Sequence, residues 1–106
     1  LDPPYNQHSY LGNYHVWETL VRWDRPEVYG IARKRTDVRA RRSAFNGKRS
    51  IGPALARTIA ALRCPVIVLS FNDEGHLSRD AVLDILGPRR HLRVLEIPYG
   101  RYVGGR

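Results

Sequence analysis

The sequence begins with a short run of residues whose types suit chemistry on an amino group. Leu1 is followed by Asp2, Pro3, Pro4 and Tyr5. Proline fixes φ at about −65°, lacks a backbone N–H, and pushes the residue before it to extended geometry. Two consecutive prolines therefore make a stiff, extended loop with few competing donors. The Asp2 carboxylate and a loop carbonyl could accept hydrogen bonds from an exocyclic NH₂ group, and Tyr5 could cover the ring that bears it.

Three further segments follow this loop in order. Residues 13–15 read Asn-Tyr-His, residues 70–75 read Ser-Phe-Asn-Asp-Glu-Gly, and residues 99–102 read Tyr-Gly-Arg-Tyr. Together with the Asp-Pro-Pro-Tyr run, this order resembles the adenine-specific (N6) DNA methyltransferases of the Dam and restriction–modification type. The resemblance covers nearly the whole chain and is weakest in its basic middle.

The resemblance implies that the chain is part of a site-specific DNA adenine-N6 methyltransferase that uses S-adenosyl-L-methionine (AdoMet). The target adenine must leave the duplex before its amino group can react. The resemblance assigns the acceptors for that amino group to the Asp2 carboxylate and the Pro3 carbonyl, in a loop stiffened by Pro4, and the stacking ring to Tyr5. Positioning and electrostatics would carry such a transfer, without a covalent enzyme intermediate.

The resemblance also suggests residues for a base pocket. Ser70, Phe71 and Asn72 stand where the family has a strand that ends beside the base, and Tyr99 and Tyr102 flank a turn near it. Each assignment has a structural alternative. Residues 70–72 could be a capped loop with one buried aromatic ring, and the two tyrosines could be ordinary cross-strand aromatics.

Positive charge is concentrated in the middle of the chain. The net charge is +8, and eight basic residues lie between positions 33 and 49, where Asp37 is the one acid. A polyanionic partner, double-stranded DNA, is the natural inference, and a solvated basic loop is the alternative. The expected contacts to the DNA backbone are Arg33, Lys34, Arg35, Arg39, Arg41, Arg42, Lys48 and Arg49.

Apolar periodicity predicts the elements that must position these residues. Residues 1–5 are read as the end of a strand and its catalytic loop, and residues 24–50 as a basic surface loop. The remainder, 51–106, is read as helix, strand, helix and strand. Helices are predicted over residues 13–23, from 50 or 52 to 62, and from 78 to 87, and strands over 65–70 and 92–97, with a possible hairpin partner beginning at 102.

This order of elements implies an α/β fold. By resemblance, the chain is the catalytic C-terminal part of a Rossmann-like AdoMet-dependent methyltransferase sheet with flanking helices. The Gly-rich loop that grips AdoMet in the family is absent from the sequence. We therefore expect a partial catalytic domain over residues 1–106 that does not methylate alone, and whose open strand edges would favour self-association.

Other features narrow the class of protein. The four histidines and the single cysteine, Cys64, show no metal-ligand spacing, so no metal site is predicted. A lone cysteine fits a reducing cytosol, and no apolar stretch is long enough to span a membrane. The expected location is the cytoplasm, as for bacterial or phage methylases.

Two alternatives to a DNA methylase remain open from the residues. A non-enzymatic basic DNA-binding remnant of a methylase would explain the charge but not the intact Asp-Pro-Pro-Tyr loop. An RNA methyltransferase, or another amino methyltransferase, would keep the chemistry and change the substrate.

Overall fold

A computed structural model describes residues 1–87, 91–98 and 100 of the chain. Two short helices follow the first loop, α1 (Tyr10–Asn13) and α2 (His15–Arg22). The Ser9 hydroxyl caps α1 by accepting a 3.0 Å hydrogen bond from the Gly12 amide, and α2 ends at Trp23 in the left-handed region. The predicted helix over residues 13–23 is therefore present as α2, with α1 as an additional turn before it.

The apolar stripe of α2 does not face a core. Trp17 is 64% exposed and Val21 is 86% exposed, although both recur at helical spacing on one side of the helix. No segment among the described residues covers this side of the helix. An amphipathic pattern fixes which residues share a face, but burial requires a partner element for that face.

A two-stranded antiparallel hairpin follows, made of β1 (Val28–Tyr29) and β2 (Lys34–Arg35). Its turn contains Gly30 and Arg33 at positive φ, closed by a 3.1 Å bond from the Arg33 amide to the Gly30 carbonyl. Two 3₁₀ helices come next, η1 (Thr36–Val38) and η2 (Ala44–Asn46). These short elements are the regular secondary structure of the basic segment 24–50.

The main apolar cluster lies between α3 (Ile51–Ala61) and α4 (Arg79–Leu86). Ile51, Leu55 and Ile59 are buried on one stripe of α3, as their spacing predicted, and Val82 of α4 is buried with them. The Ser78 hydroxyl caps α4 by accepting a bond from the Ala81 amide. Both predicted helices are confirmed, with ends close to those expected.

The α/β class is supported only in its coarse form, as a chain of helices with a small sheet. A Rossmann-like sheet is not present among the described residues, and the strands predicted over 65–70 and 92–97 do not form there. Val66 and Val68 are 71% and 75% exposed instead of buried. A strand needs neighbours on both edges to become central, and the described chain supplies residues 65–70 with little more than Leu1.

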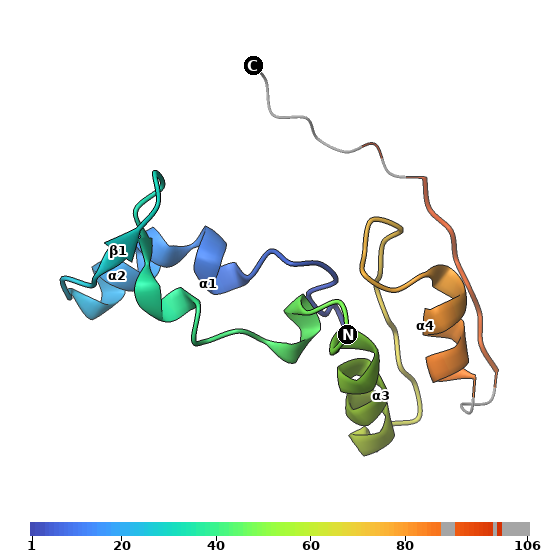
Figure 1. The fold of residues 1–106 in the computed structure, drawn as a ribbon. Coiled ribbons are helices and arrows are strands. Elements are labelled where there is room, and N and C mark those ends of the chain that lie inside the picture. Colours follow the sequence, from blue (N-terminus) through green and yellow to red (C-terminus); the bar gives the residue numbers. More distant parts are fainter. Residues whose placement is uncertain (88–90, 99, 101–106) are drawn as a thin grey trace.

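Figure 1 shows two groups of elements along the molecule, α1, α2 and the hairpin in one and α3 and α4 in the other. The chain start lies beside α3, and the segment joining α3 to α4 runs close to it. Residues 91–98 pass along α4, to which a 2.9 Å ion pair between Arg79 and Glu96 connects them. Every helix in the described ranges is too short or too polar to cross a lipid bilayer.

Candidate active site

The Asp-Pro-Pro-Tyr loop is fixed at both ends by main-chain hydrogen bonds. At its start, the Leu1 amino group donates to the Val68 carbonyl at 2.6 Å, and the Ser70 amide donates to the Leu1 carbonyl at 2.9 Å. A residue that donates to one residue of a neighbouring segment and accepts from the residue two positions later shows the bonding pattern of two parallel strands. At its end, the Tyr5 carbonyl accepts a 2.7 Å bond from the His76 amide. Residues 68–76 therefore hold the loop from both sides.

The acceptors in the middle of the loop are left without partners. Asp2 is exposed, and among the described residues neither its carboxylate nor the Pro3 carbonyl accepts a hydrogen bond. Pro3 and Pro4 have no N–H with which to compete. The loop thus presents a carboxylate and a main-chain oxygen from a backbone that is anchored on each side.

The structure brings the predicted pocket residues Ser70, Phe71 and Asn72 next to this loop. The Tyr5 and Phe71 rings are tilted by 58° with their centroids 5.9 Å apart, which is an ordinary edge-to-face contact. The Asn72 side chain accepts a 3.0 Å bond from the Glu74 amide and shapes its own turn. Tyr99 and Tyr102, the other predicted pocket residues, lie outside the described residues.

Gly75 occupies the tightest point between the two loops. A Cβ atom built there would lie 2.7 Å from Phe71 Cε1, 3.1 Å from the Asn72 carbonyl oxygen and 3.2 Å from the Tyr5 carbonyl oxygen. Only a residue without a side chain allows the loop of residues 71–77 to approach Tyr5 this closely.

Asn46 of η2 joins the segment that follows the Asp-Pro-Pro-Tyr loop to the basic segment. Its side-chain amide donates to the Asn6 carbonyl at 3.0 Å and to the His8 carbonyl at 3.1 Å. The two bonds tie the residues that follow Tyr5 to the end of the segment 24–50.

One predicted DNA contact, Arg35, has a different role in the structure. It is 2% exposed, and its guanidinium donates to both carboxylate oxygens of Asp24 and of Asp37, for example at 2.8 Å and 2.9 Å from Nη2. Its fifth N–H donates to the Thr19 hydroxyl of α2 at 3.3 Å, so the guanidinium has no donor to offer a phosphate. Arg35 joins α2, β2 and η1, and we correct its assignment from DNA contact to internal ion pair.

These hydrogen bonds set the protonation of the cluster. The Arg35 hydrogen bonds hold the pKa of Asp24 and the pKa of Asp37 below their ordinary value of 3.8, although partial desolvation opposes this shift. The same bonds raise the pKa of Arg35. All three groups are therefore charged at neutral pH.

The other predicted DNA contacts differ in how much they are engaged. Arg39 lies over the Tyr29 ring, with its guanidinium carbon 3.9 Å from the centroid, and Arg41 pairs with Glu18 at 3.1 Å.

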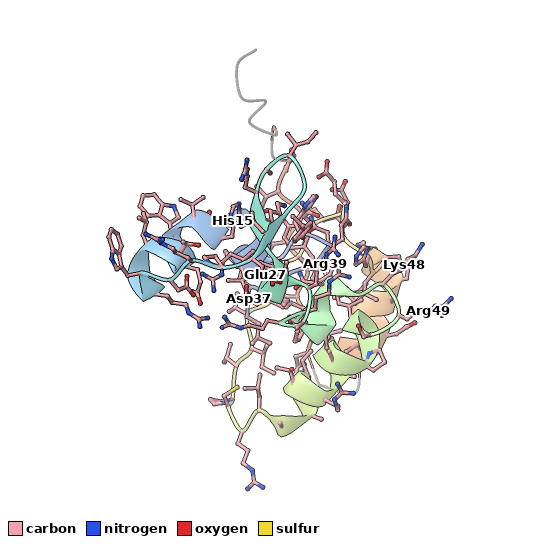
Figure 2. All side chains as sticks on the ribbon, turned by 60° about the vertical axis from the view of Figure 1, so that its left-hand side comes forward. His15, Glu27, Asp37, Arg39, Lys48 and Arg49 are labelled. Carbon is pink, nitrogen blue, oxygen red and sulfur yellow. The ribbon has the colours of Figure 1, made fainter. Side chains whose placement is uncertain are left out.

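Lys48 and Arg49 project outward from the loop before α3 (Figure 2). Arg33 and Arg42 are exposed, and Lys34 is half-buried.

Within the described residues, no group of three or more His, Cys, Asp or Glu side chains could hold a metal ion. Cys64 is exposed.

Comparison with known proteins identifies the family. The profile described as D12 class N6 adenine-specific DNA methyltransferase matches residues 1–82. The chain belongs to this class. The expected family resemblance is thereby confirmed, and the match spans both the Asp-Pro-Pro-Tyr loop and residues 70–75 of this D12-class chain.

Several curated proteins are similar to the D12-class chain. It is 33% identical over 105 residues to the type II methyltransferase M.FokI of Planomicrobium okeanokoites and 30% identical over 105 residues to the modification methylase StsI of Streptococcus sanguinis. Each alignment covers 96% of the chain but 16% of the relative. The type II methyltransferase M.NlaIII of Neisseria lactamica is 29% identical over 96% of the chain and 30% of its own length. No solved structure matches the chain significantly.

Sequence reasoning did not predict the internal ion pairs of Arg35 or the contacts of Asn46 and Gly75. For Arg35 a weak signal existed, because Asp37 lies two residues away within an otherwise basic run. For Asn46 no local signal exists, since its partners lie 38 and 40 residues earlier. Gly75 was part of the family motif, but its contact with Tyr5 depends on tertiary structure.

Proposed function

We propose that this chain supplies the adenine-binding and catalytic loop of a DNA adenine-N6 methyltransferase. The observation that carries the proposal is the loop anchored at Leu1 and Tyr5, with the Asp2 carboxylate and Pro3 carbonyl free between the anchors. Family membership and the names of the methylase relatives support the same activity.

The loop would act on the amino group of the base. The adenine nitrogen is a poor nucleophile because its lone pair is delocalised into the ring. Two fixed acceptors for its protons, the Asp2 carboxylate and the Pro3 carbonyl, favour a more tetrahedral nitrogen whose lone pair is available. Because the anchors hold both oxygens in place before the base arrives, little reorganisation is required during the reaction.

Tyr5 would stack on the base after it has left the duplex. Its ring is braced from one side by Phe71, which leaves its position set by packing. Phe71 is thus proposed to support the stacking ring, with Ser70 and Asn72 lining the adjacent turn. We retain Tyr99 and Tyr102 as the proposed far wall of the base pocket.

The described residues do not provide a site that fits AdoMet. No Gly-rich loop between a strand and a helix is present among them, so its binding is assigned to other parts of the protein. AdoMet, when bound, supplies the methyl group. The residues of this chain supply the acceptors, the stacking ring and the contacts to DNA.

Double-stranded DNA in the bacterial cytoplasm is the proposed substrate and setting. The exposed cations Arg33, Arg39, Arg41 and Arg42, with Lys34, Lys48 and Arg49, are proposed to contact the phosphate backbone. Such contacts position DNA without reading its sequence. Arg35 is left out of this set because its donors are used internally.

The experiment uses the complete product of the reading frame that contains this chain. Transfer of tritium from labelled AdoMet to adenine is measured on duplex DNA and, in parallel, on RNA. Asp2→Ala is expected to abolish transfer and leave the melting temperature unchanged, because Asp2 is exposed and makes no contact that stabilises the fold. Asp84→Asn, an exposed carboxylate on α4, is the control and should keep full activity.

Normal methylation by the Asp2→Ala protein would refute the assignment of the loop. Methylation of RNA and not DNA would keep the chemistry and replace the substrate.

A further inference from the structure

A basic hollow of about 220 Å³ lies against the segment that follows the Asp-Pro-Pro-Tyr loop. We call it the Lys34 hollow. Its walls include Gln7, His8 and Ser9 from the segment after Tyr5, and Lys34, Arg39 and Arg42 from the basic segment. None of the described residues that line it carries a carboxylate. Three cations therefore share one concave site without an internal counter-ion in its walls.

The hairpin explains how the cations reach this site. Tyr29 and Lys34 are opposite each other in the register of β1 and β2, so their side chains leave the same face. Both line the Lys34 hollow. Arg35 is the next residue and leaves the other face, where Asp24 and Asp37 take up its charge. The acids of this region are thereby kept away from the hollow.

Arg39 is held at the hollow by the ring of Tyr29. The guanidinium carbon lies 3.9 Å from the ring centroid, which restricts the side chain while leaving its N–H groups free to donate at their edges. A restrained arginine loses less entropy on binding an anion than a mobile one. Asn46, which also lines the hollow, fixes the opposite wall through its bonds to the Asn6 and His8 carbonyls.

The distance to the catalytic loop limits what can bind. His8 is three residues beyond Tyr5, so a fully extended chain would separate them by at most about 11 Å. This is the scale of one or two nucleotides. A phosphate group has the tetrahedral oxygens that arginine and lysine donors recognise.

We propose that the Lys34 hollow binds a single phosphodiester of the DNA strand that carries the target adenine, within one or two nucleotides of that base. The inference rests on the proposed function for the source of the phosphate. It adds that Lys34, Arg39 and Arg42 hold the same phosphate and thereby register the strand against Asp2 and Tyr5, whereas Lys48 and Arg49 lie on a different part of the surface (Figure 2).

The first arm of the test measures DNA binding by the complete reading-frame product as a function of NaCl concentration. Each phosphate contact makes the fall of log K with log salt steeper by about 0.9, so Arg39→Gln/Arg42→Gln should make that fall shallower by about one, as one phosphate is lost, and not by two. Arg57→Gln/Arg63→Gln removes the same charge from exposed positions of α3 and the residues after it, and should leave the slope unchanged.

The second arm titrates the ¹⁵N-labelled chain with inorganic phosphate at constant ionic strength. Saturating shifts of the Ser9 and Gly12 amides are expected for the wild type and the Arg57→Gln/Arg63→Gln chain, and not for Arg39→Gln/Arg42→Gln. Arg39→Lys/Arg42→Lys keeps the charges and should retain most of both responses. This variant guards against a loss that reflects misfolding.

Equal slope changes in the two double variants would overturn the proposal, as would the absence of a saturable shift with phosphate. Shifts with phosphate but an unchanged DNA slope would mean that the hollow takes a free phosphate, which also overturns it. Neither arm measures methyl transfer. If the chain passes both arms but the complete reading-frame product never methylates adenine, the proposed function is refuted and the phosphate site stays in place.

Discussion

The Tyr5 carbonyl accepts a 2.7 Å hydrogen bond from the His76 amide, across 71 positions of the sequence. This bond brings the loop of residues 71–77 against the end of the Asp-Pro-Pro-Tyr run. It fixes Tyr5, while Asp2 and Pro3 stay without hydrogen-bond partners among the described residues. The candidate active site is therefore made by two loops, and each depends on the other for its position.

Gly75→Ala should separate these two loops. The added Cβ would meet Phe71 Cε1 at 2.7 Å and the Tyr5 carbonyl oxygen at 3.2 Å, and the second contact is with backbone that cannot rotate away. We expect methyl transfer by the complete protein to fall at least about tenfold, which corresponds to roughly 1.4 kcal/mol of lost positioning. Gly52→Ala is the control, because its Cβ would make an ordinary 3.6 Å contact with Leu77. Unchanged activity in Gly75→Ala would show that the contact does not position Tyr5.

Arg35→Gln should destabilise the hairpin and α2 together. The substitution leaves the carboxylates of Asp24 and Asp37 without the guanidinium that bridges them. Arg22 still pairs with Asp24 at 3.2 Å and with Asp37 at 3.6 Å, but its side chain is 49% exposed, so two partly buried carboxylates would share one solvent-exposed cation. We expect the melting temperature to fall by several degrees. Arg33→Gln, at an exposed turn position, should leave it unchanged, and equal melting of both variants would contradict the internal role of Arg35.

The stability of the folded chain at acid pH should depend on the same cluster of Arg35, Asp24 and Asp37. Hydrogen bonds from Arg35 lower the pKa of Asp24 and the pKa of Asp37 from 3.8 in the folded chain. The resulting stability is present above the unfolded value of about 3.9 and is lost as pH falls through the lower folded values. Melting temperatures measured from pH 7 to pH 2 should therefore drop below about pH 4. The drop should be smaller in Arg35→Gln, and an identical drop in both would exclude these carboxylates as its cause.

The 106-residue chain alone should not methylate DNA. It spans 16% of the length of M.FokI and StsI, and its described residues hold no Gly-rich loop for AdoMet. Incubation of the chain with tritiated AdoMet and adenine-containing duplex DNA should leave the DNA unlabelled, whereas the complete reading-frame product should label it. Incorporation of tritium by the chain alone would disprove this expectation.

The helices could be predicted well because their signals are local. Ser78 caps α4 from the adjacent position, and the spacing of Ile51, Leu55 and Ile59 places them on one face of α3. The strands could not be predicted in the same way. An apolar run such as 65–70 becomes a strand only when neighbouring strands pair with it. In the described chain, the main-chain bonds of this run to another segment are those that join Val68 and Ser70 to Leu1.

By itself, the sequence determined the chemistry that the first loop can offer and the family to which the chain belongs. Asp2, Pro3, Pro4 and Tyr5 are adjacent, so their stiffness and their acceptors follow from covalent structure. It also determined that positive charge gathers between residues 33 and 49.

Only the tertiary structure decided which of those charges is available. Lys34 and Arg35 are neighbours with the same charge, yet β2 sends them to opposite faces of the hairpin. Lys34 lines the hollow beside residues 7–9, and Arg35 is buried between Asp24 and Asp37. The alternation of side chains along a strand separates them, and the carboxylates of Asp24 and Asp37 then occupy the donors of Arg35 but not those of Lys34.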